Sequence, residues 1–226
     1  MKLQNKMTSK YIVGASLILS LLFVLIGYQK GDISDQFSEG KPGTIVSVLL
    51  LLAISFTCFR IFILRRRTAA NWLRHPSLVW LLIASGFLFL ALDDALKIHE
   101  GIDKSIHAMS EMTETSLSDR MDDAIIGIYA LIGVFVLYVY RSELTPYRFL
   151  APYLLAGFAV LALSIALDAA SNGLGFALWV TNSESAAHSL HALLDTLEEV
   201  CKLLAEAIFL SGFLLVLQAT AEQDKT

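Results

Sequence analysis

The sequence has little cysteine and no long polar stretch, and each absence excludes a class of protein. Its two cysteines, Cys58 and Cys201, lie in separate apolar segments without C-x-x-C spacing, which argues against a disulfide framework and a thiolate metal site. The longest polar stretch runs from about Lys97 to Asp123 and is too short to fold as a separate soluble domain. We therefore expect residues 1–226 to form a single domain.

Long hydrophobic runs dominate the rest of the chain. Hydrophobic residues make up 56% of the sequence, the mean hydropathy is +0.64, and several runs approach the ~20 residues with which a helix crosses a bilayer. The runs are too long and continuous for the strands of a barrel. The sequence thus predicts an all-α integral membrane protein, a bundle of six transmembrane helices. The expected spans are residues 11–28, 44–64, 78–97, 124–140, 149–168 and 186–218.

The distribution of charge predicts how the bundle is oriented. Lysine and arginine gather in the stretches 2–10, 60–74 and 141–148, on one side of the expected bundle, whereas most carboxylates fall on the other side. Cytoplasmic loops of membrane proteins carry this excess of positive charge. Both termini are therefore expected in the cytoplasm. This pattern favours a bacterial plasma (inner) membrane, with an organellar membrane left open.

Polar side chains along the last expected helix are the strongest functional signal. At about 100° per residue they stay within roughly a 100° arc of the helix surface. Ionisable groups are costly beside hydrocarbon, so the stripe is expected to face partners, water or a bound ion rather than lipid. The stripe consists of His188, His191, Asp195, Glu198, Glu199, Lys202 and Glu206.

A second group of polar residues lies at the outer end of the third expected span. Asp93 and Glu100 are seven positions apart and share a helix face, with His99 on one flank. The helical spacing continues through Asp103 and His107, past the membrane surface. The third and sixth helices are therefore both expected to extend on the outer side, where they bring their polar residues to the same membrane level.

Crowded carboxylates near hydrocarbon repel one another and lose hydration, which predicts a cation among them. One or two divalent metal ions would remove the repulsion, and a mixture of His, Asp and Glu suits zinc, iron or manganese. Helical bundles build such sites from side chains on facing helices. The expected ligands are Asp93, His99, Glu100, His191, Asp195 and Glu198, with Glu199 as general base and Lys202 holding a carboxylate or polarising the substrate.

Several of these residues also have structural explanations. Asp122 and Asp123 are well placed to cap a helix N-terminus, and Asp168 is placed to end its helix. Lys202 can pair with glutamates at helical spacing. A purely structural polar network between helices is a further alternative, although a costly way to hold a bundle together.

One short motif resembles a known family. His191-x-x-x-Asp195 is similar to the H-x-x-x-D of cation diffusion facilitators, which also have six spans and two cytoplasmic ends. The resemblance implies metal binding at these two residues. It covers only this motif, which here lies in the last helix, and the family's cytoplasmic metal-binding domain has no counterpart. The five histidines are too few for the histidine boxes of membrane desaturases and hydroxylases.

Two functions are compatible with these patterns. The first is a metal-dependent membrane enzyme, a hydrolase or di-metal oxidoreductase, that acts on a lipid or other hydrophobic small-molecule substrate at the outer interface. The alternative is a transporter or channel for divalent cations or protons, with Glu206 near the bilayer midplane. Below Glu206 the last helix offers few polar residues before Gln218, which favours the enzyme. Expected partners are lipid, metal ion and substrate, with no nucleic acid, and small residues such as Gly157 are compatible with a homo-oligomer.

Overall fold

The computed structural model describes residues 2–38, 40–66, 75–96, 98, 121–171, 174–181 and 183–224. Every regular element in this part of the chain is a helix, which confirms the predicted fold class at the level of an all-helical protein. The long helices are α1 (Lys2–Lys30), α2 (Pro42–Arg66), α3 (Leu78–Leu96), α5 (Met121–Val139), α7 (Ala151–Ser171) and α9 (Glu184–Gln223). The shorter ones are α6 (Arg141–Leu144), the 3₁₀ helix η3 (Thr145–Leu150) and α8 (Gly175–Thr181).

Five helical segments are long and apolar enough to cross a membrane, as judged from length and composition. They are Lys10–Lys30, Pro42–Arg66, Leu78–Leu96, Arg141–Ser171 and Glu184–Gln223. In α5, the shorter segment Gly127–Val139 is apolar. Large apolar side chains of α5 point outward, since Leu131 is 70% and Phe135 66% exposed, as expected for a surface that meets lipid. The length and composition of these helices indicate a multi-pass membrane protein.

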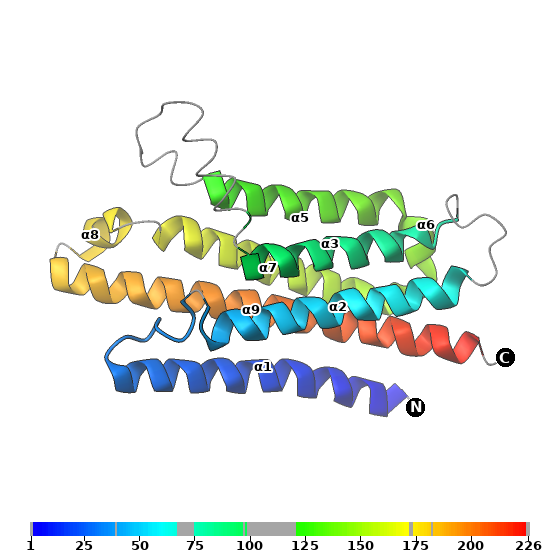
Figure 1. The fold of residues 1–226 in the computed structure, drawn as a ribbon, viewed down its shortest axis with the longest axis horizontal. Coiled ribbons are helices and arrows are strands. Elements are labelled where there is room, and N and C mark those ends of the chain that lie inside the picture. The colour runs from blue at the N-terminus through cyan, green and yellow to red at the C-terminus, as the bar shows by residue number, and fades with distance from the viewer. Residues whose placement is uncertain are drawn as a thin grey trace.

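The helices lie side by side along the long axis of the molecule, with α1 at one edge and α5 at the opposite edge (Figure 1). The helix α9 packs against α1, α2, α7 and α8, and α2 packs against α3. The N-terminal end of α1 and the C-terminal end of α9 lie at the same end of the bundle (Figure 1). The helices α1, α2, α7 and α8 are thus arranged around α9, the helix that carries the polar stripe.

Aromatic side chains fill the core where α3, η3 and α9 meet. Trp80 is fully buried and contacts the rings of Tyr147 and Phe213 edge to face, with ring centroids 5.7 Å and 6.4 Å away. Edge-to-face aromatic pairs add to the stabilisation that comes from burying their area. This core fixes one end of α3 against α9.

Glycines allow α7 to approach α9 closely. A Cβ atom on Gly157 would lie 2.5 Å from Cε1 of Phe209, and one on Gly212 would lie 2.8 Å from Cβ of Tyr153. No real side chain tolerates such contacts without movement, so both positions need glycine. Small residues at helix interfaces serve this purpose in membrane proteins.

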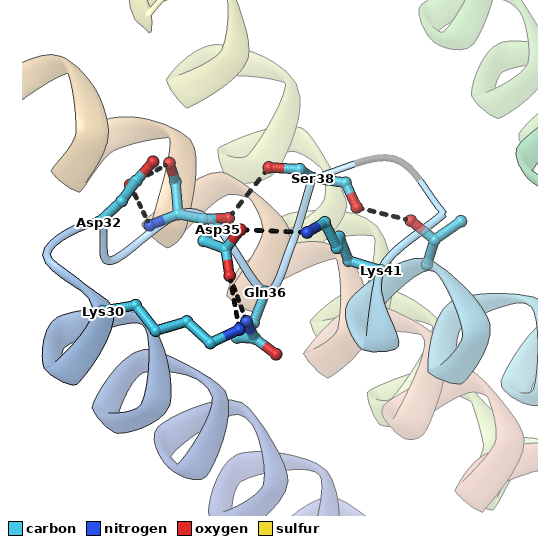
Figure 2. A network of polar contacts seen from close by, with 8 residues as sticks. Lys30, Asp32, Asp35, Gln36, Ser38 and Lys41 are labelled. Carbon is cyan, nitrogen blue, oxygen red and sulfur yellow. Dashed lines mark hydrogen bonds and ion pairs between the residues drawn. The ribbon is translucent and has the colours of Figure 1, made fainter.

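The segment between α1 and α2 is held by one carboxylate. Asp35 forms ion pairs with Lys30 at 3.1 Å and with Lys41 at 3.2 Å, and Gln36 also donates a hydrogen bond to it (Figure 2). The hydrogen bonds from Lys30 and then Lys41 lower the pKa of Asp35 below its ordinary value. In the same segment Phe37 is buried against Phe23 of α1. The turn therefore connects α1 and α2 through both ionic and apolar contacts.

Some elements differ from the sequence prediction or fall outside the described residues. The short helix α8 was not predicted, and α7 continues past Asp168 to Ser171. The expected extension of the third helix through Asp103 and His107 lies outside the described residues. The last helix has 40 residues, or a length of about 60 Å, which is about twice the thickness of the hydrocarbon core of a bilayer.

Candidate functional site

Lys202 of α9 lies at the centre of a cluster of charged residues. Its Nζ donates a hydrogen bond to Oε1 of Glu199, one turn earlier on the helix, at 2.9 Å. The same Nζ lies 3.6 Å from Oδ1 of Asp94 on α3. The pairing of Lys202 with a glutamate at helical spacing is therefore present, and a second carboxylate from another helix joins it. The third and the last long helices thus meet through their polar side chains.

Glu206 lies one turn further along α9 and is 6% exposed. Ser47 of α2 donates a hydrogen bond from its Oγ to Oε1 of Glu206 at 2.7 Å. The other oxygen, Oε2, is buried and has no hydrogen-bond partner among the described residues, and the same holds for Oδ2 of Asp94 and Oε2 of Glu199. A buried polar atom without a partner is costly. The cluster thus keeps three acceptors available for a ligand.

These residues line a cavity of about 790 Å³. Its volume lies within the range of sites that take small molecules. Most of the wall is apolar and includes Leu82, Ile83, Phe87, Leu90, Val136, Leu154, Phe158, Leu161, Phe209 and Phe213. The polar part of the wall includes Ser47, Asp93, Asp94, Tyr129, Asp168, Glu198, Glu199, Lys202 and Glu206.

The helix α5 supplies one wall of the cavity. It packs against α3 and α7 at the edge of the bundle, and the rings of Phe89 on α3 and Tyr129 on α5 meet edge to face at 5.3 Å. Gly133 leaves space on this wall, since a Cβ atom there would lie 3.9 Å from the nearest atom, Cζ of Phe158. A larger side chain at Gly133 would therefore point into free volume.

The structure brings half of the predicted site residues to this cavity: Asp93, Glu198, Glu199 and Lys202. His191 and Asp195 lie nearer the start of α9, outside the cavity wall, where Nδ1 of His191 is 3.5 Å from Oδ1 of Asp195. His99 and Glu100 fall outside the described residues. The predicted set is thus divided between the cavity, an adjacent pair and a segment that the structure does not describe.

A metal ion needs several ligand atoms at about 2.0–2.6 Å from one point. Within the described part of the chain, no group of three or more His, Cys, Asp or Glu residues could hold such an ion. These residues alone therefore do not fit a metal centre. Two of the six predicted ligands, His99 and Glu100, lie outside the described residues. Binding of zinc, iron or manganese by all six therefore stays a prediction.

Two residues of the cluster were missed by the sequence analysis as site residues. Asp94 directly follows Asp93, and neighbouring helix positions differ by about 100°, so only the packing of α3 beside α9 decides which of them reaches Lys202. Ser47 lies in an apolar run, where a single hydroxyl is a weak signal. The sequence placed Glu206 on a transport path, whereas in the structure it also lines the cavity.

Fold and cavity together define the class of this protein, a multi-pass helical membrane protein with charged residues in an apolar cavity. The chain belongs to the family described as Domain of unknown function (DUF8692), which matches residues 11–217. No curated protein and no solved structure matches the chain. The family match extends from α1 to α9, so the cavity and its charged cluster lie within the family's domain.

Proposed function

We propose that this protein takes a hydrophobic small molecule from the bilayer into the cavity and acts on it as an enzyme. One observation carries this proposal: acceptor atoms that have no hydrogen-bond partner in the described part of the chain lie in a mostly apolar cavity of about 790 Å³. Ligand sites commonly combine apolar walls with a few polar groups that orient the ligand. A cavity that served only for packing would not need six carboxylates and an ammonium group.

The proposed chemistry uses Glu199 and Lys202. The ammonium group of Lys202 holds Oε1 of Glu199 at 2.9 Å, which leaves Oε2 to accept a proton from the substrate as a general base. The positive charge of Lys202 would then stabilise negative charge that develops on the substrate. Since the described residues alone do not fit a metal ion, no step of this proposal is assigned to one.

We further propose that the cavity lies towards the extracytoplasmic side of a plasma membrane. Asp94 is near the C-terminal end of α3, and the arginines Arg65 and Arg66 are at the C-terminal end of α2, which runs in the opposite direction (Figure 1). Positive charge concentrates on the cytoplasmic side of membrane proteins. The charged cluster would therefore be nearer to the other side.

Photolabelling of the cavity tests whether it takes hydrophobic molecules. The protein in lipid nanodiscs is exposed to a long-chain alcohol that carries a diazirine, and labelled residues are identified by mass spectrometry. Phe209 and Phe213 line the cavity and are buried from the surrounding lipid, so we expect labelling there. Labelling confined to lipid-facing residues such as Leu131 and Phe135 would contradict the proposal.

Two glycine variants of α5 make this test specific. Gly133→Phe should fill the cavity and remove the labelling of Phe209 and Phe213. Gly127→Phe makes the same change on the same helix, at a position that is not part of the cavity wall and where a Cβ atom would meet no other element of the described structure within 4 Å. It should label like the natural protein. Equal loss in both variants would indicate a general disturbance of α5 instead.

Transport of a divalent cation or proton is the second candidate function, and the depth of Glu206 favours it. Glu206 lies about 26 Å along α9 from Gln223, the last residue of that helix. This is deeper than a site at the membrane surface requires. Intramembrane carboxylates commonly mark ion pathways. Flux of protons or Mn²⁺ into proteoliposomes that is lost in Glu206→Gln would support transport. No flux above protein-free liposomes would reject it.

A further inference from the structure

Within the described part of the chain, the charged cluster contains more negative than positive groups. Asp94, Glu199 and Glu206 supply three carboxylates, and the single ammonium group of Lys202 lies against two of them. Each carboxylate keeps one buried oxygen without a hydrogen-bond partner among the described residues. The unmet requirement of the cluster is thus for positive charge and for N–H donors.

Glu206 shows this requirement most clearly. It is 6% exposed, it lines the cavity, and Ser47 occupies only one of its two oxygens. The buried oxygen Oε2 has lost its hydration without gaining a partner among the described residues, which is unfavourable. A ligand that brings a positive N–H group to Oε2 would form a charge-assisted hydrogen bond, which is stronger than a neutral one.

The arrangement suits an organic ammonium group better than a metal ion. A metal ion needs ligands that converge on one point, and the described residues provide no such group. An ammonium group has several donors that can reach acceptors in different directions. The apolar wall, which includes Phe87, Phe158 and Phe209, can bury a hydrocarbon body, and aromatic faces also attract cations.

We therefore propose that the ligand of this cavity is a hydrophobic amine, bound in its protonated form. Its ammonium group pairs with Glu206 and Asp94, and its hydrocarbon part lies between α3, α5 and α7. This inference rests on the proposed function, because it requires that the cavity takes hydrophobic molecules at all. To that proposal it adds that the polar group of the substrate is a protonated amine.

Competition against the diazirine label tests the inference. Dodecylamine, dodecanol and dodecanoate share one chain and differ only in the charge of the polar group. In a phosphatidylcholine nanodisc, dodecylamine should protect Phe209 and Phe213 at about a tenfold lower concentration than dodecanol, because its ammonium group forms a charge-assisted hydrogen bond that a neutral hydroxyl group cannot form. Hexylamine in parallel distinguishes the source of the amine: protection by dodecylamine alone indicates a membrane-borne amphiphile, and equal protection indicates a water-soluble amine.

Variants identify the carboxylate that carries the preference. Glu206→Gln keeps the shape of the side chain and an acceptor for Ser47 but removes the charge, so the advantage of dodecylamine over dodecanol should disappear. Glu222→Gln, an exposed position on the same helix, should keep it. If Glu206→Gln does not fold, Asp94→Asn is measured in its place and should reduce the advantage by several-fold.

The outcomes separate this inference from the proposed function. Equal protection by all three compounds would overturn the inference and leave a cavity for hydrophobic molecules. Stronger protection by dodecanoate, or a preference for dodecylamine that survives in both Glu206→Gln and Asp94→Asn, would also overturn it. If the diazirine alcohol never labels Phe209 or Phe213, the proposed function fails, and the inference fails with it.

Discussion

Arg65 of α2 and Glu143 of α6 form an ion pair with two hydrogen bonds. Nε of Arg65 donates to Oε1 of Glu143 at 2.8 Å, and Nη2 donates to Oε2 at 3.1 Å. Trp80 of α3 donates from Nε1 to the same Oε1 at 3.3 Å. Both oxygens of this buried carboxylate are thus satisfied, whereas Asp94, Glu199 and Glu206 each keep one buried oxygen without a hydrogen-bond partner among the described residues. The pair connects α2, α3 and α6.

The first prediction concerns the stability that this pair provides. Arg65→Met removes the cation and, among the described residues, leaves the buried charge of Glu143 with the hydrogen bond from Trp80, so we expect the free energy of unfolding to fall by about 3 kcal/mol. Thermal unfolding in detergent, followed by circular dichroism, measures the change. Arg60→Met removes an exposed arginine from the same helix and should have a much smaller effect. Similar losses in the two variants would contradict the assigned role of the pair.

The second prediction concerns the contact between α7 and α9. Gly157→Ala places a methyl group against the ring of Phe209, which should lower the free energy of unfolding by about 1–3 kcal/mol. Adding Phe209→Leu makes room, so the double variant should lose less than the sum of the two single losses. Gly14→Ala serves as the control, because the new methyl group would meet no other element of the described structure within 4 Å. Additive losses would show that Phe209 is not the obstacle.

The third prediction concerns pH and Asp35. Its pKa is lowered in the folded protein by Lys30 and Lys41, so ionised Asp35 contributes stability above its unfolded pKa of about 4. This contribution is lost as the pH falls through the lowered pKa of the folded state. Melting temperatures should therefore be lower for Asp35→Asn than for the natural protein at pH 7, and the difference should vanish in acid. A constant difference at all pH values would exclude this origin.

The fourth prediction concerns metal content. The ligands inferred from sequence predict a stoichiometric zinc, iron or manganese ion that is lost in Asp93→Ala, His191→Ala and Glu198→Ala, as measured by mass spectrometry of protein purified in detergent. Asp35→Asn, at an acidic residue outside the predicted site, should keep the ion. The prediction would be wrong if protein from cells grown with each of the three ions contained no metal. The cavity and its charged cluster would then have no metal-dependent role.

Much of the fold follows from simple sequence signals. Apolar runs placed α2, α3 and α7 to within a few residues, because a helix that crosses a bilayer needs a continuous run of this length. The helical period also placed Glu199 and Lys202 on one face of α9, and the structure has both side chains in the wall of one cavity. These are local properties of a helix, which sequence spacing describes well.

Other features depend on how helices pack. His191, Asp195 and Glu198 were predicted as ligands of one site, and the structure has Glu198 in the cavity wall and His191 and Asp195 outside it. The choice of Asp94 over Asp93 as the partner of Lys202, and the hydrogen bond from Ser47, result from the positions of α3 and α2 beside α9. The seven residues of α8 are too few to give a clear periodic signal.

The edge position of α5 affects how a molecule moves between the cavity and the bilayer. Among the described residues, no member of the buried core lies on the segment Gly127–Val139, whereas α2, α3 and α9 share that core. Segments with few buried contacts open at the lowest free-energy cost. Outward tilting of α5 would thus create a lateral portal, through which a fatty molecule could pass directly from the lipid phase without entering water.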